Sequence, residues 1–92
     1  MTELPADPGL PTLAIVVPCF NEQETIAFTV DTLLEHLDGM VAGGIVASAS
    51  FLFFVDDGSR DATWALLSAA RQVDRRVRGL RLSRNFGHQP AL

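Results

Sequence analysis

Two adjacent carboxylates, Asp56 and Asp57, are the residues of this chain whose type and spacing most directly suggest chemistry. They follow an unbroken apolar run at 51–55, so each must be solvated or hydrogen-bonded. They could accept hydrogen bonds from a ligand or bind a metal; alternatively, one caps a helix while the other faces water. Because consecutive residues of an extended chain point to opposite sides, separate roles are favoured over a shared metal.

A second polar cluster, residues 18–22, follows another apolar run. Asn21 suits the N-cap of a helix, and Glu22 is placed to reach a ribose hydroxyl, as acidic residues do in other nucleotide sites. Phe20 fits either a base pocket or the core. Cys19 fits a small buried residue better than a nucleophile, because no base near it supports catalysis.

A third cluster spans residues 83–88 and contains Arg84. Its planar guanidinium suits phosphate oxygens, and a salt bridge to an aspartate in the neighbouring loop is an equal alternative. His36 and His88 have no partner at metal-ligand spacing, so metal binding by either is disfavoured. The sequence has no G-x-G-x-x-G and no Walker A motif, which excludes the usual dinucleotide and P-loop sites.

Apolar periodicity predicts the elements that position these clusters. The first strand is expected to end at Pro18 and to be covered on both faces. The first helix is expected to begin at an Asn21 N-cap, which forms a capping box with Glu24, and to end at about Gly39. Ser59 or Asp61 is expected to cap a second helix. The expected strands are Leu13–Val17, Phe51–Val55 and Val77–Leu82. The expected inward helix faces are Ile26, Val30, Leu33, Leu34 and Leu37, then Ala62, Leu66, Ala69, Ala70 and Val73.

The resulting β-α-β-α-β order predicts an α/β fold with parallel strands and right-handed crossovers. Ligands of open parallel sheets bind at the carboxyl ends of the strands, where all three polar clusters fall. The order therefore predicts a binding site at that edge. A purely structural module would leave the clustering unexplained.

Composition bounds the class of protein. The chain has 92 residues, a net charge of −4 and one cysteine, which excludes an intrachain disulfide and paired-cysteine zinc sites. The acidic total disfavours a nucleic-acid binder, and the seven arginines, all after residue 57, are spread over several expected elements and form no single run. Residues 1–11 are expected to be a flexible leader without signal-peptide features, and 12–92 the N-terminal part of one truncated domain. The uncharged stretch 39–55 is shorter than the about 20 apolar residues of a membrane span, and is interpreted as a flexible connection into a strand.

Three motifs in order resemble one family. Residues 16–22 (VVPCFNE) and 54–63 (FVDDGSRDAT) are similar to the first- and second-strand motifs of family 2 glycosyltransferases. Residues 82–92 (LSRNFGHQPAL) resemble the branch that charges a polyprenyl phosphate, such as dolichol-phosphate mannose synthases and bactoprenol glucosyltransferases. The resemblance implies a partial GT-A (Rossmann-like) nucleotide-binding domain. It implies that the base and ribose of a UDP- or GDP-sugar are surrounded by Pro18, Phe20, Glu22, Val55 and Asp57, with Asp56 close by; Asn21 and Arg84 complete the candidate nucleotide-binding set.

The resemblance further implies inverting transfer to a polyprenyl phosphate, assisted by Mg²⁺ or Mn²⁺. The metal-binding Asp-x-Asp motif, the acceptor region and any membrane helices of the family are expected beyond residue 92. The sequence is therefore expected to hold no catalytic residue and no metal ligand, and to be an inactive N-terminal portion of an enzyme of the cytoplasmic membrane face. The alternatives are a non-catalytic nucleotide-binding remnant and a receiver-like domain, against which the absence of lysine weighs.

Overall fold

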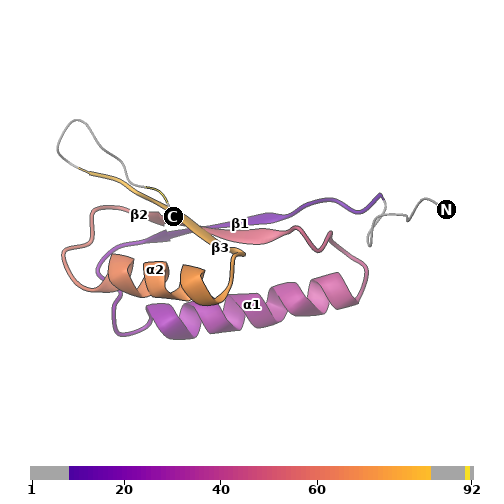
Figure 1. The fold of residues 1–92 in the computed structure, drawn as a ribbon, viewed down its shortest axis with the longest axis horizontal. Helices are drawn as coiled ribbons and strands as arrows, with labels where there is room; N and C mark the ends of the chain where they lie inside the picture. Colours follow the sequence, from indigo (N-terminus) through magenta and orange to yellow (C-terminus); the bar gives the residue numbers. More distant parts are fainter. Residues whose placement is uncertain (1–8, 84–90, 92) are drawn as a thin grey trace.

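The computed structural model describes residues 9–83 and 91, and these form three strands and two helices (Figure 1). The order is β-α-β-α-β, as the apolar periodicity predicts. The elements are β1 (Ala14–Cys19), α1 (Ile26–Ala42), β2 (Phe51–Asp56), α2 (Thr63–Val73) and β3 (Val77–Arg81).

The strands form one sheet in the order β1-β2-β3, and both neighbouring pairs are parallel. This confirms the predicted parallel pairing. Cys19 is paired with Asp56, and Asp56 with Arg81, so the carboxyl ends of all three strands meet at one edge. The loops that follow β1 and β2 must therefore begin side by side.

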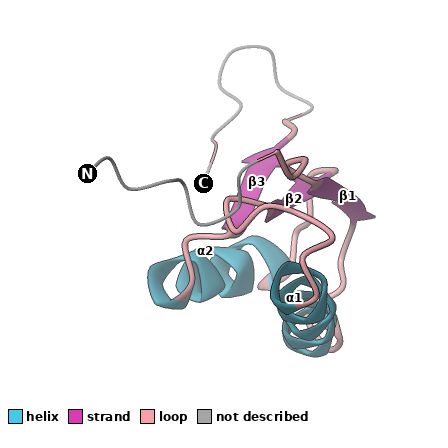
Figure 2. Ribbon diagram, turned by 90° about the vertical axis from the view of Figure 1, so that its right-hand side faces the viewer, coloured by secondary structure: helices cyan, strands magenta, loops and turns pink. Residues whose placement is uncertain are grey.

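Both helices cover the same face of the sheet (Figure 2). Leu52, Phe54 and Val77 point to that face and are fully buried, together with Leu37 and Leu67 of the helices. The two crossovers advance in the same direction across the sheet, and crossovers of one hand then place their helices on one side. The expectation that β1 is covered on both faces is wrong for the described residues: Val16, on the opposite face, is 62% exposed.

β1 also continues past the residue expected to end it. Pro18 lies within the strand, in register with Val55. The backbone N–H groups of Phe51 and Asp57 donate to the carbonyls of Leu13 and Cys19. Every second residue of β1 therefore directs its backbone groups toward β2, and the nitrogen of Pro18, which lies between two such residues, points away from β2. A missing N–H costs nothing at that position of a strand that is at the edge of the described sheet.

The predicted start of α1 is wrong. The helix begins at Ile26, after Thr25, and neither Asn21 nor Glu24 forms a capping box. Asn21 instead has a left-handed backbone, with φ +48°, and its Oδ1 accepts a hydrogen bond from the N–H of Arg60. A partner distant in sequence has replaced the local cap.

α1 also ends later than predicted. Gly39 lies inside the helix, which runs to Ala42. Gly44 has φ +69°, and its N–H and that of the next residue donate to the carbonyls of Val41 and Met40. This is a Schellman C-cap, the turn that the Gly-Gly pair encodes. The expected flexible connection 39–50 is thus helix, cap and a hydrogen-bonded turn.

The inward face of α2 differs from the predicted one. Thr63 and Leu67 are fully buried, whereas Leu66 is 37% and Val73 90% exposed. Thr63 can point inward because its hydroxyl donates to Asp61 Oδ1 and accepts a hydrogen bond from a backbone N–H of the neighbouring loop. A hydroxyl with both partners satisfied is tolerated in the interior, and this pairing is invisible to apolar periodicity.

Candidate functional site

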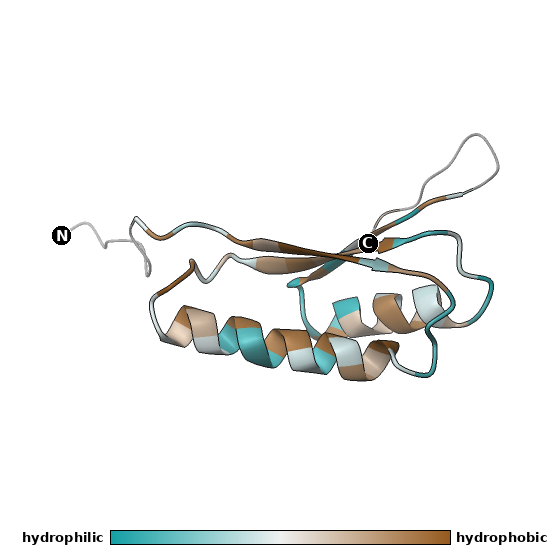
Figure 3. Ribbon diagram, turned by 180° about the vertical axis from the view of Figure 1, so that it is seen from behind, coloured by the Kyte–Doolittle hydropathy of each residue, from teal (hydrophilic) through white to brown (hydrophobic). Residues whose placement is uncertain are grey.

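The loops after β1 and β2 carry the hydrophilic residues at the carboxyl edge of the sheet (Figure 3). Residues 20–25 follow β1 and residues 57–62 follow β2. The backbone N–H of Asp57 donates to the Cys19 carbonyl over 2.9 Å, which continues the β1–β2 pairing into the loops. Two of the three predicted polar clusters are therefore adjacent in space.

The two neighbouring aspartates lie in different environments. Asp56 is fully buried on the helix-covered face, and its Oδ1 accepts a hydrogen bond from the Ser59 N–H at 2.9 Å. Its Oδ2 finds no hydrogen-bond partner in the described part of the chain. Asp57 is exposed. Asp56 thus holds the turn from within, while the Asp57 carboxylate is available to a ligand.

Asn21 contacts the β2–α2 loop through both its backbone and its side chain. Its N–H donates to Ser59 Oγ and its Oδ1 accepts from the Arg60 N–H, each over 2.8 Å. Arg81 of β3 supports the same turn, because its Nη2 donates to the Ser59 carbonyl over 2.9 Å. Asn21 is exposed as a residue, but its amide oxygen is already bonded to protein.

The next residues extend this contact. The Glu22 N–H donates to Thr63 Oγ1 over 2.8 Å, and the Gln23 N–H donates to Asp61 Oδ2 over 3.2 Å. Gln23 Oε1 in turn accepts the N–H of Ala62 over 3.0 Å. The backbone around Glu22 is fixed by these bonds while Glu22 itself is exposed.

Asp61 accepts a hydrogen bond from the first residue of α2, but the N-cap of the helix is Ala62 and makes no side-chain cap, so the prediction that Ser59 or Asp61 is the cap is wrong. Asp61 Oδ1 accepts the Thr63 N–H over 2.9 Å. Partial desolvation raises the pKa of Asp61, but the hydrogen bonds from Thr63 and Gln23 outweigh it and hold this pKa below its ordinary value. Ser59, the other predicted cap, donates its N–H to Asp56.

Apolar side chains border the carboxylates on the open face of the sheet. Pro18 is exposed and Val55, its register partner, is half-buried. Phe20, just beyond β1, is 44% exposed. Arg84 lies outside the described residues. The structure thus brings exposed carboxylates and apolar surface together at one edge, the combination that a heterocyclic base with a ribose requires.

The model of glycosyl transferase family 2 matches residues 14–92, which is nearly the whole chain. The chain belongs to this family. The fold agrees with the assignment, since three parallel strands in β-α-β-α-β order form the N-terminal part of a GT-A Rossmann-like domain.

Curated members of the family are similar to the chain over most of its length. It is 46% identical over 82 residues to an uncharacterized glycosyltransferase, YkoT, of Bacillus subtilis (strain 168), covering 89% of this chain and 24% of the relative. It is 35% identical over 80 residues to a prophage bactoprenol glucosyl transferase homolog of Escherichia coli (strain K12), covering 87% and 24%. It is 32% identical over 81 residues to an undecaprenyl-phosphate 4-deoxy-4-formamido-L-arabinose transferase of Yersinia pestis (strain Pestoides F), covering 87% and 23%. The chain thus spans about a quarter of the length of these family members.

The described part of this family member does not fit a divalent cation. No group of three or more His, Cys, Asp or Glu side chains comes close enough within residues 9–83 and 91 to hold one.

Cys19 is buried. The pKa of its thiol is raised to about 12, mainly by this burial and to a lesser extent by the nearby carboxylates of Asp56, Glu22 and Asp61. The thiol is therefore protonated at neutral pH and is not a nucleophile.

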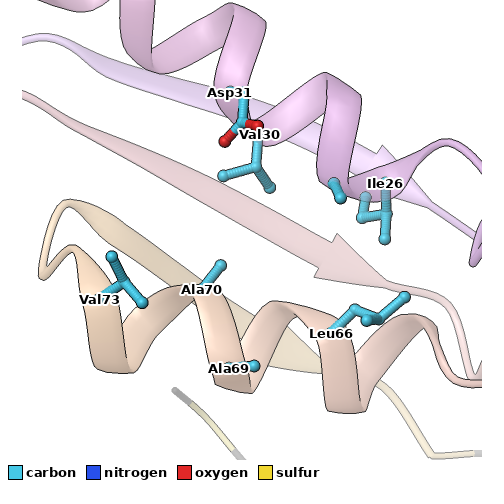
Figure 4. A pocket seen from close by; sticks show the side chains of 8 residues that line it. Ile26, Val30, Asp31, Leu66, Ala69, Ala70 and Val73 are labelled. Atoms are coloured by element: carbon cyan, nitrogen blue, oxygen red, sulfur yellow. The ribbon is translucent and has the colours of Figure 1, made fainter.

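An apolar groove of about 270 Å³ lies between α1 and α2 (Figure 4). Ile26, Val30 and Leu66 line it, with Asp31 as the charged residue of its lining. It lacks the convergent polar groups that a nucleotide needs, so the candidate site is the loop pair.

Among the described residues, no helix is long and apolar enough to cross a bilayer.

Sequence reasoning missed several residues that build the site. Neither apolar periodicity nor the polar clusters indicate the hydrogen bonds that Thr63, Gln23 and Arg81 make. Thr63 and Gln23 act through hydrogen bonds between segments about 40 residues apart, and Arg81 acts through a bond from β3 to Ser59, 22 residues away. The family motif that contains Thr63 was the one available signal, because the motif extends to that residue.

Proposed function

We propose that this chain supplies the nucleotide-binding half of a family 2 glycosyltransferase that moves a sugar from a UDP- or GDP-sugar to a polyprenyl phosphate. The observation that carries the proposal is the placement of Glu22 and Asp57, two exposed carboxylates on hydrogen-bonded loops at the carboxyl edge of a parallel sheet. Such edges are where nucleotides bind in open α/β sheets. The segment that matches the family model, residues 14–92, includes both loops.

Each candidate residue has a distinct proposed role. Asp57 accepts a hydrogen bond from an N–H of the base, and Glu22 accepts one from a ribose hydroxyl. Pro18, Phe20 and Val55 provide the apolar surface against the base. Asp56 lies close by and supports the turn from inside; Asn21 and Arg84 stay candidates for nucleotide contact, the latter through phosphate.

The proposed acceptor needs few catalytic groups from the protein. A polyprenyl phosphate is already an anion, so its oxygen can attack the sugar carbon with little help from a general base, and attack opposite the leaving diphosphate inverts that carbon. Relatives named for bactoprenol and undecaprenyl phosphate support this choice of acceptor. A lipid acceptor places the reaction of the whole enzyme at a membrane, for which we propose the cytoplasmic face.

Mg²⁺ or Mn²⁺ would offset the charge that develops on the diphosphate. The described residues do not fit such a cation, so we propose that its ligands lie elsewhere in a longer enzyme and assign no step to it here. The same observation favours one second candidate, a remnant that binds nucleotide without turnover.

Nucleotide binding by this chain is the direct test. Amide chemical shifts are followed by NMR while UDP, GDP and, as a control base, ADP are added. We expect UDP or GDP to shift the amides of residues 20–22 and 55–58, and ADP to shift them less. Shifts confined to other elements, or none with either nucleotide, would refute the proposed site.

A further inference from the structure

Asn21 is held at both ends by the opposite loop. Its N–H donates to Ser59 Oγ and its Oδ1 accepts the Arg60 N–H, so one residue is bonded to two consecutive residues of the other loop. Each bond is 2.8 Å long. Gln23 makes the same kind of double contact further along the loop. Its N–H donates to Asp61 and its side-chain oxygen accepts the N–H of Ala62.

The backbone of Asn21 explains why this residue type is suited to the position. Its φ of +48° is in the left-handed region, which ordinary side chains adopt only at a cost. Asparagine tolerates that conformation and also supplies an acceptor oxygen. Glycine would tolerate the backbone but lacks the oxygen, and alanine satisfies neither requirement.

The bonded residues flank the two carboxylates of the proposed site. Asn21 directly precedes Glu22, and Ser59 and Arg60 follow Asp57 with one glycine between. A nucleotide that bonds to Glu22 and Asp57 together bridges the two loops, so the separation of the loops must match it. Any change that lowers the fraction of molecules with the loops in contact lowers the apparent affinity by that fraction.

We infer that Asn21 is a positioning residue: it ties the β1–α1 loop to the β2–α2 loop so that Glu22 and Asp57 are held at the spacing a nucleotide requires. This role replaces nucleotide contact as the function of the Asn21 amide oxygen, which acts on the protein, and it rests on the proposed function. The role is shared with Gln23, whose side chain bonds Ala62 one step further from the carboxylates.

Three variants separate the side chain from the backbone. Asn21→Gly keeps the left-handed conformation and removes the acceptor. Asn21→Asp keeps both the conformation and an acceptor oxygen. Thr29→Ala is the matched control, since it removes a side-chain hydrogen bond to the carbonyl of Thr25, at the start of α1, and leaves the bonds of Asn21 to the β2–α2 loop in place.

Two measurements are made on these variants at a temperature where each is folded. Hydrogen exchange of the Arg60 amide reports the loop contact without any ligand. The dissociation constants for UDP and GDP report the site. We expect faster Arg60 exchange in Asn21→Gly than in the parent chain, recovery in Asn21→Asp, and an affinity in Asn21→Gly weaker by about threefold to tenfold, the factor that one neutral hydrogen bond is worth. Thr29→Ala should match the parent in both.

The outcomes distinguish this inference from the proposed function. Unchanged nucleotide affinity in Asn21→Gly, or Arg60 exchange no faster than in the parent, overturns the positioning role. A uniform rise in exchange across the chain, with affinity unchanged, shows a general structural role and also overturns it. If the parent chain binds neither UDP nor GDP, the proposed function fails for this chain, whereas selective acceleration at Arg60 would still establish the tie between the loops.

Discussion

Asp57 and Asp56 are neighbours in sequence and opposites in environment, and this contrast sets what each substitution should do. Asp57 is exposed, and its proposed partner is a donor on the nucleotide. Asp56 is fully buried, and its partner is the Ser59 N–H. Changes at Asp57 should therefore affect binding, while changes at Asp56 should affect folding.

Asp57→Asn should weaken the binding of the nucleotide donor by about 1.5–3 kcal/mol, because a hydrogen bond to a charged acceptor is lost or reversed. The unfolding free energy should stay within about 0.5 kcal/mol of the parent value, as for other surface changes. Isothermal calorimetry with UDP and GDP measures the first and urea unfolding the second. Unchanged affinity would remove Asp57 from the site.

Asp56→Ala should lower the unfolding free energy by about 1–3 kcal/mol, because the Ser59 N–H is left buried without an acceptor. Asp56→Asn keeps an acceptor oxygen and removes a buried charge whose Oδ2 has no partner in the described residues, so its loss should be smaller. Urea denaturation of both variants gives the comparison. Equal losses would mean that the charge, and not the acceptor, holds the turn.

At the level of the elements, the two glycines near the end of α1 should respond in opposite directions. Gly44 has φ +69° and open space around an added Cβ, so Gly44→Ala should cost about 1–2 kcal/mol from backbone conformation alone. Gly39 lies within the helix, also with open space, so Gly39→Ala should stabilise by about 0.5–1 kcal/mol. Thermal or urea unfolding tests both; shifts of the same sign would contradict the Schellman cap.

The turn between α2 and β3 should make stability depend on pH. Arg76 donates to both carboxylate oxygens of Asp74, over 3.1 and 2.8 Å, and to Asp38 over 2.6 Å. The hydrogen bonds from Arg76 outweigh desolvation and hold the pKa of Asp74 below its ordinary value of 3.8. A lowered folded-state pKa stabilises the protein above the unfolded-state value, and that stability is lost as the pH falls through the folded-state pKa.

Asp74→Asn should therefore destabilise the chain near neutral pH, by less than about 1 kcal/mol because the pair is partly exposed to solvent. The difference from the parent should be constant from about pH 5 to 7 and shrink as the pH falls below about 4. Urea titrations at a series of pH values measure it. A difference that grows on acidification would have the wrong sign for this pair.

At the scale of the whole molecule, the sheet has one face that the two helices cover and one face that no described element covers. Helices pack against Leu52, Phe54 and Val77, while Val16 on the other face is exposed. The guanidinium of Arg78 lies 4.1 Å from the ring centre of Phe51 and shields part of that open face. A chain of this size with an apolar face in water should be marginally stable and prone to association.

This chain by itself should form no sugar-lipid. Its described residues hold no cluster fit for a cation, and the relatives that it matches are about four times longer. The assay supplies the purified chain with Mg²⁺ or Mn²⁺, labelled UDP- and GDP-sugars and polyprenyl phosphate. Product above a control without protein would show that the catalytic groups have been misplaced, and would also exclude the non-catalytic remnant.

Features that depend on short-range pattern were predictable from the sequence. Apolar runs and helical periodicity gave the number, type and order of the elements, and their order required parallel strands. The carboxyl-edge rule then brought residues 20–25 and 57–62 together. The divergent environments of Asp56 and Asp57 followed from alternation along an extended chain.

The sequence by itself thus determined which loops meet, and the tertiary structure decided how they are joined. The left-handed backbone of Asn21, the burial of Thr63 and the tolerance of Pro18 within β1 all depend on partners or neighbours fixed by the register of the sheet. That register places Cys19 beside Asp56, and the hydrogen bonds between the loops follow from it. A capping box at Asn21 was a reasonable local solution, but the N–H of Arg60, 39 residues away, offered the amide oxygen a better-placed donor once the strands had paired.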